Sequence, residues 1–171
     1  MPYSPTIRAA PARPMIAVEA GPSDLGAVAG ALGAVLPDCG ASVTAVGGTL
    51  HRFGPVSLLW IGAPDAPAPD PSVLDATPAA GARIICDVSD AHGWIDLSGR
   101  DALSVLAQGV ALDLRAGAFP PGTAVRTLAF GVEVMLRRTA PDSFAIACRA
   151  SYHDFLLARL RLAADPAGEA R

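Results

Sequence analysis

The pattern of apolar and polar positions is most regular between residues 83 and 114. Ile84, Cys86 and Val88 alternate with Ile85 and Asp87, and a second short run covers residues 94–97. Between them, residues 90–93 (Asp-Ala-His-Gly) are of the types that form turns. Because alternation of period two is typical of half-buried strands, this stretch predicts a β-hairpin.

A helix is predicted directly after this hairpin. Ser98 and Asp101 have the spacing of a capping box, in which the hydroxyl and the carboxylate accept hydrogen bonds from the first free N–H groups of a helix. Gly109 can adopt the positive φ that commonly ends a helix. The apolar residues between these signals recur at helical spacing and predict one buried face: Leu103, Leu106 and Val110.

The same periodicities predict the remaining elements. A helix is expected from Ser23 until Pro37 stops it, and a second capping box, Ser151 with Asp154, predicts a closing amphipathic helix. On this last helix the expected apolar face comprises Tyr152, Phe155, Leu156, Leu160 and Ala163. Strands are expected over residues 15–20 (an edge strand), 41–46, 49–53, 56–61, 123–138 (two strands or one bent strand) and 144–148.

The order of these elements predicts the fold class and the domain organisation. Runs of strands that feed single helices, without regular βαβ alternation, indicate an α+β fold with a mostly antiparallel sheet and a few packed amphipathic helices. Residues 1–14 predict a mobile arm rich in proline and alanine, and residues 165–171 a tail. Residues 15–164 predict a single domain in two halves, joined by the proline-rich loop 63–78 with a boundary near residue 80.

Composition points to a protein partner and away from nucleic acid and membrane. Apolar residues make up 51% of the chain and charged residues only 17%, so some surface is expected to be buried against another protein. The net charge is −3, and the 13 basic residues are scattered arginines, which argues against a nucleic-acid interface. The apolar run from Leu25 to Leu36 is shorter than the ~20 residues that span a bilayer. Without lysine, P-loop, pyridoxal and lysine-base chemistry are excluded.

The three cysteines predict neither a disulfide framework nor a zinc site. Cys39, Cys86 and Cys148 are odd in number, far apart and without a CxxC pair. Cys86 and Cys148 lie in strand-like apolar runs, where free cysteine is usually a buried apolar residue. We therefore expect a protein of the reducing cytoplasm.

Asp87, Asp90, His92 and Asp96 are the most concentrated candidates for chemistry. Three carboxylates and an imidazole within ten residues could hold a divalent metal ion. In the expected hairpin, however, the strand residues do not point at the turn residues, and Asp in such turns usually accepts backbone N–H groups. We therefore predict turn residues and no metal site.

The other polar and aromatic candidates also favour structural roles. His51 and His153 lie at no spacing typical of metal ligands, and no serine stands in a GxSxG motif. Trp60 and Trp94 could stack on a flat ligand such as a pterin, but large aromatic residues in strands are more often part of a core or an interface. We predict no catalytic, cofactor-binding or metal-binding residue in this chain.

The second half of the chain resembles the gamma subunit of heterotetrameric sarcosine oxidase, a small chain related to the folate-binding fold of the glycine-cleavage T-protein. The matching positions are Ser98-Gly99, Leu103, Leu106, Gly109, Leu112-Asp113-Leu114, Phe119 and Gly122, then Phe144–Cys148, Arg149–Tyr152 and Phe155–Leu162. The resemblance covers about residues 56–164. It departs from the family at residues 60–65, a reduced form of a tryptophan-aliphatic-glycine-proline-aspartate motif, and at the proline-rich loop that replaces a strand. This chain is thus expected to be a divergent or shortened member.

The resemblance implies a non-catalytic accessory subunit of an oxidase that demethylates sarcosine, or a related N-methyl amine or amino acid, and transfers the one-carbon unit to tetrahydrofolate. It also implies that FAD, FMN, NAD, tetrahydrofolate and zinc lie in the other subunits. The implied partners of this chain are the alpha, beta and delta subunits, with alpha as its main contact. A fold alone does not confer folate binding, because function depends on the site. Two alternatives stay open: an autonomous folate-binding, aminomethyltransferase-like protein with Asp96 or Asp113 as its carboxylate, and a homo-oligomeric small-molecule binding module.

Overall fold

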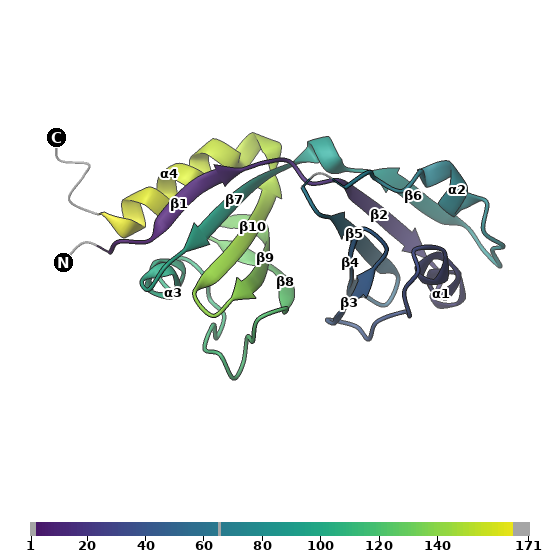
Figure 1. The fold of residues 1–171 in the computed structure, drawn as a ribbon, viewed down its shortest axis with the longest axis horizontal. Coiled ribbons are helices and arrows are strands. Elements are labelled where there is room, and N and C mark those ends of the chain that lie inside the picture. Colours follow the sequence, from purple (N-terminus) through teal and green to yellow (C-terminus); the bar gives the residue numbers. More distant parts are fainter. Residues whose placement is uncertain (1–2, 65, 166–171) are drawn as a thin grey trace. The chain divides into compact units, whose positions relative to one another are not determined.

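Two antiparallel five-stranded sheets form the framework of the protein in a computed structural model that describes residues 3–64 and 66–165. The chain divides into two units, each built on one sheet (Figure 1). The N-terminal unit is Ala12–Ser89, and the C-terminal unit combines Met1–Pro11 with Asp90–Arg171. The predicted α+β class with mostly antiparallel strands is confirmed.

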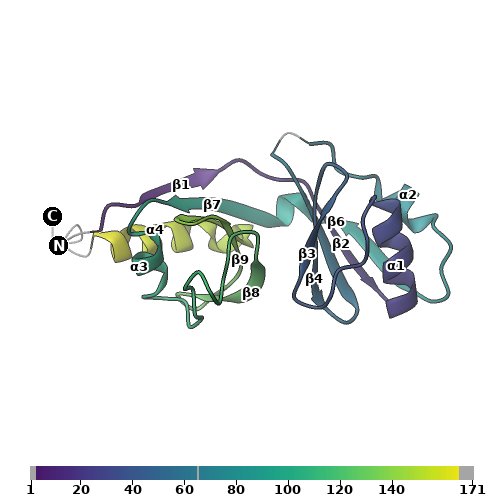
Figure 2. The same ribbon diagram turned by 60° about the horizontal axis from the view of Figure 1, so that its bottom comes forward.

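The N-terminal unit has the strand order β3-β4-β5-β2-β6 and carries both of its α-helices on one face. Its elements are β2 (Met15–Ala20), α1 (Pro22–Ala31), β3 (Ser42–Ala45), β4 (Gly48–Gly54), β5 (Ser57–Gly62), α2 (Pro71–Asp75) and β6 (Arg83–Asp87). Leu25 and Val28 of α1 and Leu74 of α2 pack against apolar residues of β2 and β5. Figure 2 shows α1 lying beside β2 and α2 in this unit.

Helix α1 ends earlier than the sequence predicts, because a glycine motif and not Pro37 stops it. Gly33 has φ +68, its N–H donates to Gly30 O, and Ala34 N–H donates to Ala29 O. These are the two bonds of a Schellman motif, which satisfies the last carbonyl groups of the helix.

The C-terminal unit has the strand order β1-β7-β10-β9-β8, with two α-helices on one face of the sheet. Its elements are β1 (Thr6–Ala10), β7 (His92–Ser98), α3 (Ala102–Leu106), β8 (Ala124–Ala129), β9 (Val132–Ala140), β10 (Ser143–Arg149) and α4 (His153–Ala164). Helices α3 and α4 contribute Leu106, Leu156 and Leu160 to the core, all fully buried. Short 3₁₀ turns at Ser89–Ala91 and Ala150–Tyr152 precede β7 and α4.

The predicted hairpin over residues 84–97 is wrong, because its two strands belong to different sheets. Strand β6 pairs with β2, whereas β7 pairs on one edge with β1 and on the other with β10. The strand predicted over residues 15–20 forms as β2, but its predicted edge position is wrong, since β2 lies between β5 and β6. Both errors concern pairing partners far apart in sequence, which alternation of side chains does not encode.

Three predictions of domain organisation are corrected. Residues 6–10 are no mobile arm, because they form β1 along β7. The unit boundary falls at Ser89/Asp90 and not near residue 80, and the proline-rich loop 63–78 lies inside the N-terminal unit and contains α2. The first two residues, Asp65 and the predicted tail beyond Asp165 lie outside the described residues.

Neither predicted capping box forms. Ser98 ends β7, opposite Thr6 and Ser143. Helix α3 begins at Ala102, and Asp101 makes no capping bond but accepts a hydrogen bond from the Ser4 N–H at 3.0 Å. Helix α4 likewise begins after a 3₁₀ turn, without a side-chain cap. Both pairs were placed by spacing alone, whereas a capping box also requires that the helix begin at the serine.

Gly109 lies after α3, as expected. The position requires a glycine for a reason other than the expected positive φ. A Cβ atom at this position would lie 2.5 Å from the ring of Phe130, which packs directly against the Gly109 backbone. Phe130 itself has φ +51 in the two-residue turn between β8 and β9. Gly109 therefore makes room for a bulky residue held in a left-handed conformation, which costs free energy for a side chain of this size.

Candidate functional site

The four residues of the candidate metal cluster are distributed over both units. Asp87 ends β6 in the N-terminal unit, while Asp90, His92 and Asp96 belong to the C-terminal unit. Within the described ranges, His, Cys, Asp and Glu side chains nowhere gather in threes at a distance that would hold a metal ion.

Asp87 forms a local turn, as the sequence predicts. Its carboxylate accepts hydrogen bonds from the Ser89 hydroxyl at 2.5 Å and from the Ser89 N–H at 2.9 Å. The side-chain bond, followed by the backbone bond, lowers the pKa of Asp87. Ser89 Oγ also accepts from the N–H of Met15, so this turn joins the end of β6 to the start of β2.

The two carboxylates of the folate-binding alternative make different contacts. Asp96, on β7, faces Arg8 across the strand pair, with Nη2 and Oδ2 3.5 Å apart. Asp113 accepts from Nε of Arg115 at 2.9 Å, from its Nη2 at 2.5 Å and from its backbone N–H at 3.0 Å. The side-chain bond from Arg115 is the main cause that lowers the pKa of Asp113 to about 2. Both carboxylates are thus in contact with arginine.

The tryptophans and the buried cysteine belong to the cores. Trp60 and Trp94 are 0% and 2% exposed, which confirms the predicted core role, and Trp60 Nε1 donates to Val46 O at 3.1 Å. Cys148 is buried as predicted, and burial raises the pKa of its thiol. Cys86 is exposed, which contradicts the prediction, because its strand lies at the edge of the sheet.

Two histidines have defined hydrogen-bonded positions. His51 is buried on β4, with Nδ1 2.6 Å from Oγ of Ser42 on the adjacent strand β3. His153, at the start of α4, lies 3.2 Å from Trp94 O through Nε2 and 3.0 Å from the Asp154 carboxylate through Nδ1. The contact with Trp94 O joins the first turn of α4 to β7.

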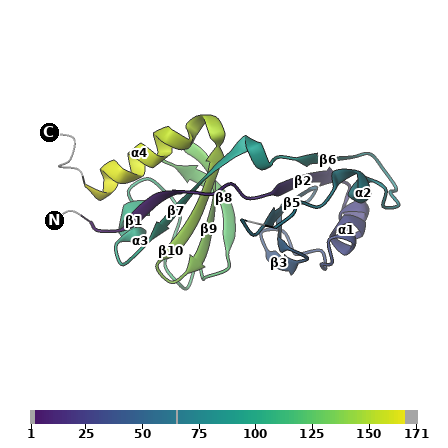
Figure 3. The same cartoon turned by 45° about the horizontal axis from the view of Figure 1, so that its top comes forward.

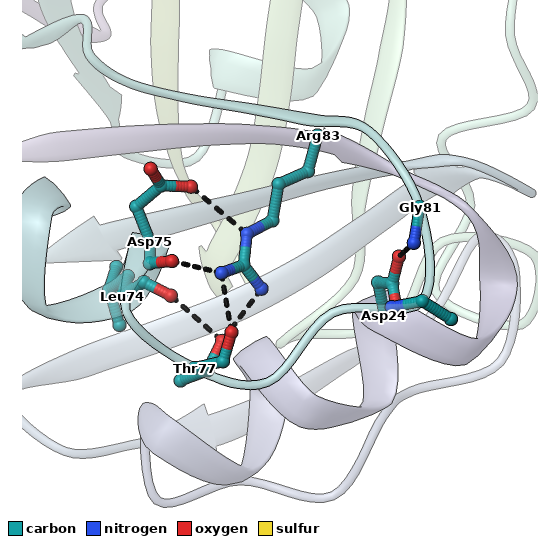
Figure 4. A network of polar contacts seen from close by, with 7 residues as sticks. Asp24, Leu74, Asp75, Thr77, Gly81 and Arg83 are labelled. Atoms are coloured by element: carbon teal, nitrogen blue, oxygen red, sulfur yellow. Dashed lines mark hydrogen bonds and ion pairs between the residues drawn. The ribbon is translucent and has the colours of Figure 1, made fainter.

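Two arginine networks, which the sequence does not single out, hold loops in place. In the N-terminal unit, Arg83 reaches from β6 to the end of α2 and the residues after it, where it bonds to the Asp75 carboxylate at 3.0 Å and to Thr77 Oγ1 at 2.8 Å (Figure 4). Its Nη2 also donates to the carbonyl groups of Asp75 and Thr77. Nearby, the buried carboxylate of Asp24 accepts from the N–H groups of residues 80 and 81 at 2.8 and 3.0 Å.

The second arginine network, in the C-terminal unit, is centred on Arg138 of β9, which is only 4% exposed. Its Nη1 donates to the carbonyl groups of Leu114 at 3.0 Å and Phe119 at 2.8 Å, and its Nε donates to Pro141 O at 3.1 Å. The guanidinium also lies over the ring of Phe144, 5.4 Å from its centroid. The adjacent pair Arg137-Arg138 is visible in the sequence, but which of the two is buried depends on the face of β9.

Comparison with known proteins assigns the family. The model of the sarcosine oxidase gamma subunit family matches residues 17–166, nearly the whole chain. The chain belongs to the sarcosine oxidase gamma subunit family. Among curated proteins none matches it.

Solved structures show the same fold as this gamma subunit family member. A chain of the heterotetrameric sarcosine oxidase from Corynebacterium sp. U-96, in complex with pyrrole 2-carboxylate, is 23% identical with a TM-score of 0.84. The similarity covers 96% of this chain and 88% of that one. The glycine cleavage system aminomethyltransferase T from Bartonella henselae is 18% identical with a TM-score of 0.62, over 93% of this chain but 46% of that one. This chain therefore shares the fold of less than half of the aminomethyltransferase chain.

Proposed function

We propose that this chain is the accessory gamma subunit of a heterotetrameric sarcosine oxidase, or of a related flavin-dependent oxidase of N-methyl amino acids. The match of the family model over residues 17–166 carries the proposal. The alpha, beta and delta subunits are the proposed partners, with alpha as the main contact, and the complex acts in the cytoplasm. Within residues 3–64 and 66–165, every helix is too short or too polar to span a bilayer.

In this proposal the chain contributes structure to the complex and no reacting group. FAD, FMN, NAD, tetrahydrofolate and zinc belong to the other subunits in this proposal, as the family resemblance implies. The contacts of the candidate carboxylates support this division. Asp113 is bound by Arg115, and Asp87 by Ser89, so each already stabilises a local turn.

Co-expression tests the proposal directly. The affinity-tagged chain is produced together with the alpha, beta and delta subunits, and the control culture produces the same three subunits with the tag alone. We expect the tagged chain to retain a complex with flavin absorbance and sarcosine oxidase activity. We also expect the alpha subunit to be less heat-stable when the chain is omitted, because a partner that binds the folded state stabilises it.

The same material separates this role from the two alternatives. The isolated chain is titrated with tetrahydrofolate, beside the variants Asp96→Asn and Asp113→Asn. Folate binding by the isolated chain that one substitution abolishes would favour an autonomous folate-binding protein. A symmetric assembly that excludes the other subunits would favour a homo-oligomeric binding module.

A further inference from the structure

Strand β6 is the last strand of its sheet in the part of the chain that the structure describes. In the view of Figure 3, β6 lies beside β2, its partner in the sheet order. The register of the pair continues past β6, because the Val88 N–H donates to Met15 O at 2.9 Å. In an antiparallel pair, residues that bond across to the partner alternate with residues whose backbone groups point away.

This alternation fixes the direction of each backbone group in β6. Since Val88 bonds to β2, so do the residues two and four positions before it, Cys86 and Ile84, which lie opposite Ala17 and Glu19. The N–H and C=O groups of the intervening residues point away from β2, toward the edge of the sheet: Arg83, Ile85 and Asp87. The edge therefore presents an ordered row of alternating donors and acceptors.

The side chains of β6 make this edge apolar on one face. Ile85 packs against the core that includes α1, so Ile84 and Cys86 lie on the opposite face of the sheet. There Ile84 is 63% exposed and Cys86 is also exposed. The exposed carboxylates of Glu19 and Asp87 lie beside them, one on each face of the sheet. The charge of Arg83, in contrast, is already paired with Asp75.

The edge strand β1 of the other sheet shows the contrast. Pro5 and Pro11 flank it, and Arg8 on it is exposed, which are features that protect sheet edges from pairing with other chains. Strand β6 contains no proline, and its pairing with β2 runs without a bulge. An apolar edge of this kind is a template for a further strand.

We propose that an extended segment of another subunit of the oxidase adds to β6 as a sixth strand of the sheet. It places apolar side chains over Ile84 and Cys86 and a basic side chain beside Asp87. An extended backbone matches the outward donors and acceptors, whereas a docked helix would bury them unpaired. This inference rests on the proposed subunit role.

A second copy of this chain fits the edge less well. Two copies of β6 paired antiparallel about Ile85 would bring Arg83 of each opposite Asp87 of the other. The Arg83 guanidinium, however, is bound by Asp75 and Thr77 within its own unit, and its side chain is only 6% exposed. The charge pair that would favour the symmetric assembly is therefore occupied.

Proline at position 85 tests the backbone ladder. Ile85→Pro removes one outward N–H and no bond to β2, while Ile85→Ala is the matched control for the lost side-chain packing. Both variants are co-expressed with the alpha, beta and delta subunits, and the unfolding midpoint of each is measured. We expect similar midpoints for the two variants, and a loss of assembly of about tenfold or more for Ile85→Pro alone.

A second pair of variants tests the apolar face. Ile84→Lys adds a charge at the edge, and Val73→Lys adds the same charge on α2, at a residue that is 64% exposed in the same unit. We expect only Ile84→Lys to weaken assembly. Hydrogen exchange gives an independent measurement, since the amides of Ile85 and Asp87 should gain protection on assembly while those of Ile84 and Cys86 are protected already.

The outcomes separate this inference from the proposed function. If the wild-type chain assembles and Ile85→Pro assembles equally well, the added strand is refuted and the subunit role stands. If the wild-type chain assembles with none of the three subunits, both are refuted. Self-association of the isolated chain that Ile85→Pro abolishes would refute the heterologous strand in favour of a second copy.

Discussion

Replacing Arg138 by methionine should destabilise the C-terminal unit more than any comparable change on its surface. The buried guanidinium donates to three carbonyl groups, those of Leu114, Phe119 and Pro141. Methionine fills a similar volume but leaves these acceptors without their donor. A buried unsatisfied acceptor costs about 1–3 kcal/mol, and removal of a buried charge returns part of that cost. We therefore expect the free energy of unfolding to fall by about 3–4 kcal/mol.

Urea unfolding of the full chain, followed by tryptophan fluorescence and circular dichroism, measures this change. With an m value of about 2 kcal/mol/M, the midpoint of the C-terminal transition should fall by about 1.5–2 M. Arg137→Met is the matched control, because Arg137 precedes Arg138 on β9, points to the other face and is only partly buried. It should cost about 1 kcal/mol or less. Arg138→Lys should lie between the two, since a point charge cannot reach all three carbonyl groups.

Equal shifts of the midpoint for Arg138→Met and Arg137→Met at unchanged m would contradict this expectation. That result would mean that the loop carbonyl groups find water or other donors once the guanidinium is gone. Arg138 would then not be needed to hold residues 114–119 to β9.

Three further predictions concern single sites. Gly109→Ala should destabilise the chain by about 1–3 kcal/mol through overpacking against Phe130, and Gly109→Ala combined with Phe130→Gly should recover part of this loss in the same urea experiment. The Asp113 carboxyl should titrate near pH 2 by NMR, and Arg115→Gln should move its pKa back toward the ordinary value of 3.8. Because the folded pKa is the lower one, the stabilising contact is fully present above about pH 4 and is lost as the pH falls through about 2. Cys148 should react with a thiol reagent only slowly in the native chain, while the two other cysteines, both exposed, react fast; equal rates for all three would contradict the burial of Cys148.

Local periodicity predicted most helices and strands but only part of their buried faces. Of the face predicted for the closing helix, Leu156, Leu160 and Ala163 are buried in α4, whereas Phe155 and Tyr152, which precedes α4, are each 51% exposed. Helical spacing gives the direction of an apolar face, but its width depends on which elements pack against it. The sheet and α3 leave the two aromatic residues uncovered in this chain.

The candidate site was predicted as far as local contacts determine it. The turn role of Asp87 depends on Ser89 two residues away, so the sequence contains both partners. The role of Arg138 depends on carbonyl groups 19 and 24 residues away, which no local pattern indicates. For the same reason the carboxylate contact of Asp101 with Ser4, 97 residues away, replaced the predicted capping box.

The sequence by itself determined the alternation of strands, the amphipathic helices, the α+β class and, through its motifs, the family. These properties follow from side chains a few residues apart, whose spacing directly sets which face they share. Only the tertiary structure decided that β6 pairs with β2 and not with β7, that residues 6–10 complete the second sheet, and that β6 ends its sheet as an apolar edge. Pairing between distant strands is settled by the packing of whole sheets, because each strand offers the same backbone donors and acceptors to every partner.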